Sequence, residues 1–190
     1  MDVYTLKPID SSISLKIGTL KNNVIGIAPF AAHKGKMYPL DKMEELIVIL
    51  SKKEDTSILL FGGGASENAA LDVLANKFDN VVNVTGRLAF EKELQLISNL
   101  SVMLSMDSGN GHLAAMYGVP VVTVWGVTHP AAGFAPIGQS KEMQLLPDLE
   151  KYPLIPTSIY GNKYPDGYLA CFNTIAPQEI AYSIKKCLNN

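Results

Sequence analysis

Residues 102–125 read VMLSMDSGNGHLAAMYGVPVVTVW, in which two apolar stretches flank a glycine-punctuated turn and a short helix. The stretches VMLSM (102–106) and VVTVW (121–125) consist almost entirely of apolar and β-branched residues, a pattern typical of strands that are buried on both faces. Two such strands separated by a helix predict a βαβ unit with parallel strands. The stretch therefore indicates an α/β fold.

The same alternation of strands and helices continues on both sides of this stretch. Further strands are predicted at residues 24–28, 57–61 and 81–84, and further helices at residues 39–50, 66–77, 90–100 and 178–188. Crossovers between parallel strands are right-handed, so this order predicts a doubly wound parallel sheet of the Rossmann-like type, covered by helices on both faces.

The 190 residues suit one domain of ordinary size with its own hydrophobic core. We interpret residues 1–23 as a lead-in or linker and residues 24–190 as the domain. Residues 126–139 are loop by composition, and residues 147–176 are rich in proline and tyrosine without a clear period. Thr128 and His129 in the first segment are candidate site residues.

The composition excludes several classes of protein. Apolar residues make up 47% and charged residues 18%, which is a globular composition and not a disordered one. The net charge is -2 and no basic tract is present, so binding of nucleic acid is not expected. Cys171 and Cys187 form no CxxC pair, so neither a zinc site nor a disulfide framework is expected.

Several common signals are absent from the sequence. There is no secretory signal and no apolar run of about 20 residues, so we expect a cytoplasmic protein. The GxGxxG and Walker A fingerprints of dinucleotide and ATP sites are missing, as are HExxH, GxSxG and DxD. We therefore expect no cofactor and no metal.

One turn after the strand at 102–106 carries the strongest candidate site. Ligands of a parallel sheet bind beyond the carboxyl ends of its strands, where helix N-termini converge. Asp107, Ser108 and Gly109 follow this strand directly, and His112 lies in the first turn of the next helix. Free N–H groups there suit a pyrophosphate, whereas the Asp107 carboxylate suits a sugar hydroxyl. The alternative, that Asp107 or Ser108 only caps the helix, stays open.

Three other turns end at the same edge of the predicted sheet. Lys36 follows the strand at 24–28 and is either a partner for a diphosphate or a solvated loop residue. Glu67 follows the triple glycine at 62–64, and it either accepts hydrogen bonds from a ribose or complements the helix dipole. Thr128 and His129 follow the strand at 121–125 and are candidates for contact with phosphate.

Taken in order, the segments APFAAHKGKMYP, LLFGGGASE, VTGRLAF and MDSGNGHLAAMYGVPVVTVWGVTHP resemble glycosyltransferase family 9, the ADP-heptose:lipopolysaccharide heptosyltransferases. The resemblance covers about residues 24–139. Its most specific piece is DSGNGHLAA followed by GVPVVTVWGVT. Ala31 and Ala32 depart from the family, because relatives often have hydroxyl residues before the Lys-x-[WY]-Pro element.

The resemblance implies that the chain is the C-terminal, donor-binding half of a GT-B glycosyltransferase. It also implies individual roles: Lys36 for the diphosphate, Glu67 for the ribose, Leu88 for the base, Asp107 for sugar hydroxyls, and the amides of Ser108 and Gly109 for the pyrophosphate, with His112 beside it.

The implied reaction is inverting, metal-independent transfer from a nucleotide sugar, ADP-heptose by resemblance, in lipopolysaccharide or other cell-surface glycan synthesis. A glycolipid acceptor and the catalytic base are expected on an N-terminal domain that this chain lacks, so the chain alone is expected to be inactive. Residues 152–172 of the second irregular segment, with the last helix, are expected to contribute to an apolar patch against which that N-terminal domain would pack. The parent enzyme is expected at the inner face of the inner membrane, with peripheral contact left open. A nucleotide-sugar epimerase of the same architecture and a non-catalytic nucleotide-binding module remain as alternatives.

Overall fold

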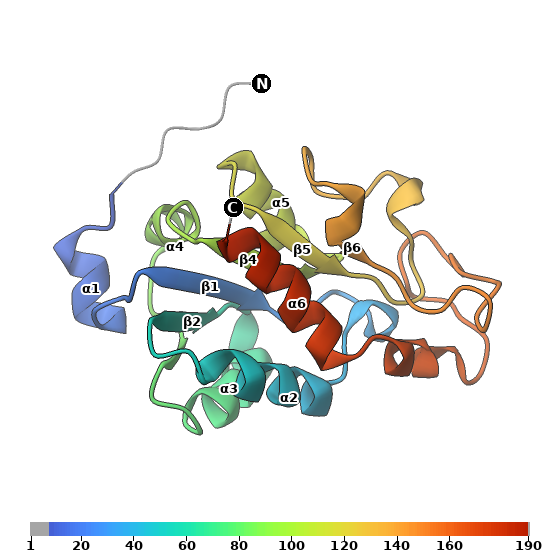
Figure 1. The fold of residues 1–190 in the computed structure, drawn as a ribbon, viewed down its shortest axis with the longest axis horizontal. Coiled ribbons are helices and arrows are strands. Elements are labelled where there is room, and N and C mark those ends of the chain that lie inside the picture. The colour runs from blue at the N-terminus through green and yellow to red at the C-terminus, as the bar shows by residue number, and fades with distance from the viewer. Residues whose placement is uncertain (1–7, 190) are drawn as a thin grey trace.

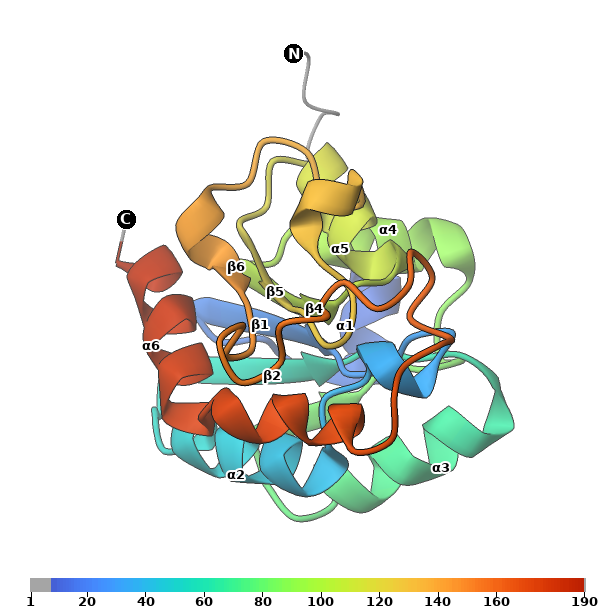
Figure 2. The same ribbon diagram turned by 90° about the vertical axis from the view of Figure 1, so that its right-hand side faces the viewer.

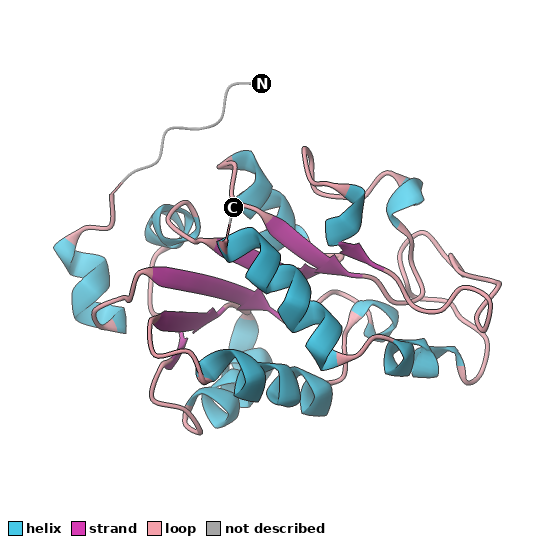
Figure 3. Cartoon of the chain, viewed as in Figure 1, coloured by secondary structure: helices cyan, strands magenta, loops and turns pink. Residues whose placement is uncertain are grey.

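The structure, a computed structural model, describes residues 8–189. Parallel strands form one sheet through the middle of the molecule, with helices on both faces (Figure 1 and Figure 3). The strands are β1 (Asn23–Ala28), β2 (Thr56–Leu60), β3 (Val81–Asn83), β4 (Val102–Met106), β5 (Val121–Val124) and β6 (Gln144–Leu145).

The strand order β3-β2-β1-β4-β5-β6 places a reversal in the middle of the sheet. The chain first adds β2 and β3 on one side of β1, and β4 then returns to pair with the other edge of β1, with Ile25 opposite Val102 and Ala28 opposite Ser105. The connections after β1 and β4 therefore leave towards opposite sides of the sheet. In doubly wound sheets this switch point is where a ligand crevice opens.

Helices cover the two faces of the sheet. Within the described residues the α-helices are α1 (Ser11–Ile17), α2 (Leu40–Ser51), α3 (Gly64–Ala75), α4 (Phe90–Ile97), α5 (Gly109–Met116) and α6 (Pro177–Leu188). Helices α2, α3 and α6 share one apolar core, and α1, α4 and α5 share the other. Within residues 8–189, none of the helices has the length and apolar character of a membrane-spanning segment.

The strands supply both cores because successive side chains of a strand point to opposite faces. In β1, Ile25 and Ile27 pack with the first group of helices, whereas Val24 and Ala28 pack with the second. All of these side chains are buried, which explains why the strands lack the polar alternation of a half-exposed sheet.

The predicted doubly wound parallel sheet is confirmed, and each of the predicted strands and helices is present. Two differences concern short elements. Helix α4 ends at Ile97 and not at Leu100, because the Leu100 amide instead closes a tight turn onto the Ile97 carbonyl at 3.2 Å. Strand β6 was not predicted, because its two residues give no pattern within an otherwise irregular region.

Helix α1 lies in the segment that we interpreted as a lead-in or linker. Asp10 caps it by accepting hydrogen bonds from the amides of Ser12 and Ile13, at 3.0 and 3.2 Å. The Lys92 ammonium and the Ser12 hydroxyl also bind Asp10 and hold the pKa of its carboxyl well below the usual range. Ile13 and Ile17 are buried in the second core. Residues 11–17 are therefore a packed helix, while residues 1–7 of the predicted lead-in lie outside the described residues.

Candidate functional site

The loops that follow β1, β2 and β4 converge at the carboxyl edge of the sheet, which faces the viewer in Figure 2. They surround a cavity of about 170 Å³. Its walls include Phe30 and Ala31 after β1, Gly62 and Glu67 after β2, and Ser108 and Gly109 after β4. Three of the predicted donor-binding residues, Glu67, Ser108 and Gly109, thus lie around one cavity.

An ion pair joins the two loops of the switch point. Lys36 ends the short 3₁₀ helix η1 (Lys34–Lys36) after β1, and Asp107 follows β4 directly. Lys36 Nζ lies 2.9 Å from Asp107 Oδ2, and the two side chains are only 14% and 4% exposed. No donor among the described residues meets Oδ2 with hydrogen-bond angles, so the attraction is mainly that of opposite charges. Lys36 is therefore not a solvated loop lysine.

The turn before α5 presents unused hydrogen-bonding groups. Ser108 occupies the N-cap position of α5, yet its side chain makes no capping hydrogen bond. The Ser108 hydroxyl oxygen is buried and has no hydrogen-bond partner among the described residues. Since the first N–H groups of a helix have no partner within the helix, they stay available to an anion. Helix capping therefore does not explain Ser108, and Asp107 is engaged with Lys36.

Gly109 and Gly111 differ in what they permit at this turn. A Cβ at Gly109 would meet no atom within 4 Å, so the backbone at the start of α5 lies open to a ligand. A Cβ at Gly111 would collide with the Ser105 hydroxyl of β4. Gly109 therefore leaves space for binding, whereas Gly111 lets the helix pack closely against the sheet.

The Glu67 carboxylate is partly engaged at the start of α3. Glu67 Oε2 accepts a hydrogen bond from the Gly63 amide at 2.8 Å, so complementation of the helix N-terminus is real. The same side chain borders the cavity, and a Cβ at Gly62 would lie 3.1 Å from Oε2. Gly62 is thus a position of close packing beside the carboxylate. Because Glu67 both accepts from Gly63 and borders the cavity, the two alternatives for Glu67 are compatible.

The other predicted residues lie outside the walls of this cavity. His112 is exposed on α5, and Leu88 is half-buried against the second core. Thr128 is 1% exposed, and its hydroxyl has no hydrogen-bond partner among the described residues. His129 caps the 3₁₀ helix η2 (Pro130–Ala132), since its Nδ1 accepts a hydrogen bond from the Ala131 amide at 3.0 Å. His129 therefore has a local structural role.

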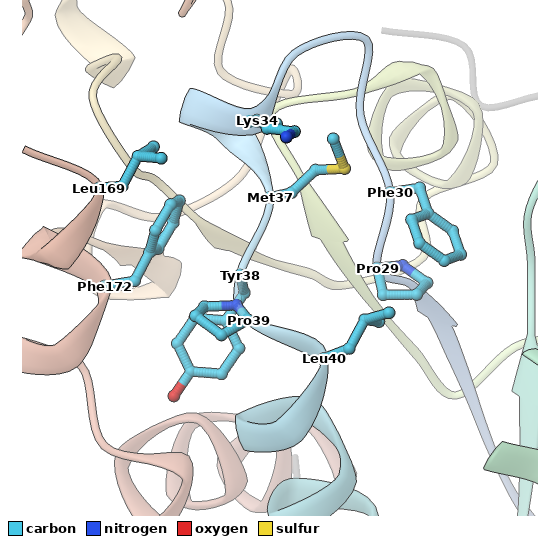
Figure 4. Close-up of a pocket in the computed structure, with 9 residues that line it drawn as sticks. All are labelled: Pro29, Phe30, Lys34, Met37, Tyr38, Pro39, Leu40, Leu169 and Phe172. Carbon is cyan, nitrogen blue, oxygen red and sulfur yellow. The ribbon is translucent and has the colours of Figure 1, made fainter. Parts of the chain in front are cut away.

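An apolar groove of about 280 Å³ lies beside η1 (Figure 4). Leu169 and Phe172 line it across from Phe30, and Tyr38 lies beneath. The Tyr38 hydroxyl donates to the Ile175 carbonyl at 2.7 Å, and burial raises the pKa of Tyr38 above its ordinary value. Tyr38 therefore anchors the turn that carries Lys36, a role that the sequence analysis missed although KMYP lies in the family segment.

No metal centre is evident in the described part of the chain. Residues 8–189 contain no group of three or more His, Cys, Asp or Glu side chains that could hold an ion. Lys36 and Asp107 are not among the residues that line the cavity, but Asp107 directly precedes Ser108, which does line it.

The sequence model of glycosyltransferase family 9 (heptosyltransferase) matches residues 2–158. The chain belongs to glycosyltransferase family 9. Among curated proteins of the family, lipopolysaccharide heptosyltransferase 3 of Escherichia coli K12 is 26% identical over 111 residues, which are 57% of this chain and 32% of that protein. The match places the lysine-bearing and aspartate-bearing turns within a family 9 domain.

Solved structures of family 9 heptosyltransferases share the fold. E. coli ADP-heptose lps heptosyltransferase II has a TM-score of 0.68 at 20% identity, over 90% of this chain and 48% of that chain. E. coli heptosyltransferase WaaC with ADP has a TM-score of 0.63 at 20% identity, over 89% of this chain and 45% of that chain. The chain thus spans about half the length of these GT-B enzymes, and the predicted fold class is confirmed.

Proposed function

We propose that this chain is the C-terminal, donor-binding domain of an inverting glycosyltransferase and binds the diphosphate of a nucleotide sugar at the carboxyl edge of its sheet. One observation carries the proposal. A nearly buried lysine lies at the switch point of a doubly wound sheet, beside the free N-terminus of α5. A cation and unpaired amides at that point suit a diphosphate, and together they replace the metal that other glycosyltransferases use.

In this proposal, different residues contact the diphosphate, the ribose and the transferred sugar. The amides of Ser108 and Gly109 and the Lys36 ammonium would hold the diphosphate, with the free hydroxyls of Ser108 and Thr128 as further donors. Glu67 would accept a ribose hydroxyl across the cavity. Asp107 would use Oδ1 for a sugar hydroxyl while Oδ2 stays with Lys36. The placement of the base near Leu88 and of His112 near the phosphate rests on the family resemblance alone.

The chemical role of this domain is to stabilise the leaving group. As the bond to the anomeric carbon breaks, negative charge grows on the departing diphosphate, and fixed donors near that charge lower the barrier. A single donor of this kind is worth about 3 kcal/mol in other enzymes. The base that deprotonates the acceptor hydroxyl, and the glycolipid acceptor itself, are assigned to the other half of the GT-B enzyme, which would act at the cytoplasmic face of the membrane.

Family membership favours a transferase over the epimerase of similar architecture. ADP-heptose is the donor we propose, because one relative, E. coli heptosyltransferase WaaC, has been solved with ADP and with ADP-2-deoxy-2-fluoro heptose. A non-catalytic nucleotide-binding module would share the diphosphate site, but it would not need Asp107 for the sugar. A change of Asp107 separates the transferase from the non-catalytic module. In a transferase domain the variant should lose its preference for the nucleotide sugar while it keeps its affinity for ADP.

Binding of ADP by the 190-residue chain tests the proposal directly. A ligand present at 100 times its Kd stabilises the folded state by ~2.7 kcal/mol, which raises Tm by roughly 5–10 °C for a domain of this size. We expect this shift with ADP and with ADP-heptose, and we expect EDTA to leave it unchanged. Calorimetry should give one site per chain. No saturable binding of ADP, UDP or their sugars would remove the proposal.

Contact between Glu67 and the ribose predicts that the chain prefers ADP, with its intact ribose, over ADP analogues that lack a ribose hydroxyl. We expect ADP to bind about tenfold more tightly than whichever of 2′-deoxy-ADP and 3′-deoxy-ADP lacks the contacted hydroxyl, since hydrogen bonds to charged groups are among the stronger ones. In Glu67→Ala this preference should fall to about twofold or less. Ser66→Ala, a change at an exposed neighbour, is the control and should keep the preference. An unchanged preference in Glu67→Ala would leave Glu67 only its bond to Gly63.

A further inference from the structure

We infer that Gly161 is a positioning residue for Lys36, a role that rests on the proposed function of Lys36 as the diphosphate ligand. Gly161 belongs to the irregular region at residues 147–176, and it is buried. Its φ is +70°, in the left-handed region. A Cβ built on it would lie 2.5 Å from Lys36 Cγ, 3.0 Å from Lys36 Cδ and 3.2 Å from Thr128 Cγ2. The aliphatic stem of Lys36 therefore occupies space that the Cβ of any residue other than glycine would fill.

The loop that carries Gly161 is fastened to the turns around it. The Thr157 amide donates to the Val127 carbonyl at 2.9 Å, and the Thr157 hydroxyl donates to the Lys163 carbonyl at 2.7 Å. The Val127 amide in turn donates to the Gly35 carbonyl at 2.9 Å. A Cβ at Gly35 would collide with the Gly161 carbonyl oxygen. The backbone beneath Lys36 is therefore held on both sides and has little room to move.

This support determines where the ammonium lies. A lysine stem has four rotatable bonds, and it loses rotamer freedom whenever its charge is held at one point. With the stem on Gly161, Lys36 Nζ reaches Asp107 Oδ2 at 2.9 Å across the switch point. A ligand that binds beside this pair then meets a cation that is already in place, so less entropy is lost on binding. Gly161 contributes to diphosphate affinity without touching the ligand.

A pair of glycine variants tests the inference. Gly161 and Gly167 both have positive φ, at +70° and +81°, but a Cβ at Gly167 would meet nothing within 4 Å. Alanine at either position therefore has a left-handed φ that L residues rarely adopt, but only Gly161→Ala also displaces the stem of Lys36. We expect Gly161→Ala to raise the Kd for ADP by about tenfold and Gly167→Ala to change it by less than about twofold. Equal Kd values for the two variants would overturn the inference.

Combining the glycine changes with Lys36→Ala separates positioning from damage to the loop. Without the lysine stem, Gly161→Ala should weaken ADP binding no further, and its excess loss of Tm over Gly167→Ala should shrink. If Gly161→Ala alone does not fold, Lys36→Ala should restore folding. Additive effects of the two changes on Kd and Tm, or a failure of this rescue, would show that Gly161 acts through the loop and not through Lys36.

A crystal structure of Gly161→Ala gives a readout that needs no ligand. We expect Lys36 Nζ to lie more than about 4 Å from Asp107 Oδ2, the usual limit of an ion pair. A pair still at its present distance would contradict the inference even if ADP binding fell. If the wild-type chain binds no nucleotide while the variant loses the ion pair, the proposed function fails but the positioning of Lys36 by Gly161 stands.

Discussion

Lys36→Met should raise the Kd of the chain for ADP by roughly 10- to 150-fold, because hydrogen bonds to charged groups are worth ~1.5–3 kcal/mol. Methionine keeps most of the stem that lies against Gly161 and removes the charge. Lys34 lies in the same turn but is exposed. Lys34→Met is therefore the matched control and should change the Kd by less than about twofold, since exposed charges are screened. Equal losses for both variants would mean that the turn attracts ADP only by its net charge.

The same change should also destabilise the fold, because Asp107 is 4% exposed and would lose its counter-charge. Removing one partner of a buried ion pair typically costs ~3–5 kcal/mol. Adding Asp107→Asn to Lys36→Met should recover much of that loss, since no unpaired charge then remains. The double variant also gives the cleaner binding measurement, because repulsion between ADP and an unpaired Asp107 is gone.

Unlike Lys36→Met, Asp107→Asn alone should leave the affinity for ADP nearly unchanged and reduce the affinity for ADP-heptose. It frees Lys36 from a competing carboxylate, so ADP should bind with its Kd changed by less than about threefold. ADP-heptose should lose its advantage over ADP, because the amide no longer offers a charged acceptor to the sugar hydroxyl. Isothermal titration of both ligands against both variants decides the division of roles. If Asp107→Asn weakens ADP as much as Lys36→Met does, Asp107 serves the diphosphate and not the sugar.

The presence of the strands was predictable from sequence, whereas the order of the strands and the pairing of the site residues were not. Buried strands of a parallel sheet are short apolar runs, so five of the strands stand out without any structure. Lys36 and Asp107 are separated by some seventy positions in the chain, and only the return of β4 to the edge of β1 brings them together. The sequence therefore indicates both residues as ligands but not their ion pair.

Gly161 and α1 were missed for different physical reasons. Gly161 acts through a missing side chain in a region without a period, and neither propensity nor pattern records what packs against a glycine. Helix α1 has seven residues, too few for a helical period to emerge, and it is stabilised by its cap and by packing. Ser108 lies between these cases: either Asp107 or Ser108 was considered as a helix cap, but only the structure shows that Ser108 holds the N-cap position without a capping hydrogen bond.

Ile13→Ala should lower the free energy of unfolding by about 2–5 kcal/mol, the usual cost of truncating a buried isoleucine. Ile13 is 0% exposed and packs in the second core, next to the part of the sheet that carries β1. Since domains of this kind are stable by only about 5–15 kcal/mol, this single change would remove a large share of the total. Urea denaturation followed by Trp125 fluorescence measures the loss, because Trp125 is itself fully buried.

Leu15 provides the matched control in the same helix. It is 87% exposed, so Leu15→Ala should change the free energy of unfolding by less than about 0.5 kcal/mol.

The effect of Ile13→Ala should extend to nucleotide binding, because the Lys16 ammonium donates to the Arg87 carbonyl at 2.9 Å and Leu88 packs against the same core. If instead both variants unfold like the wild type, residues 11–17 contribute nothing to the domain. The interpretation of residues 1–23 as a plain linker would then hold after all, and the turn around Leu88 would have to be fixed by α4 and the sheet alone.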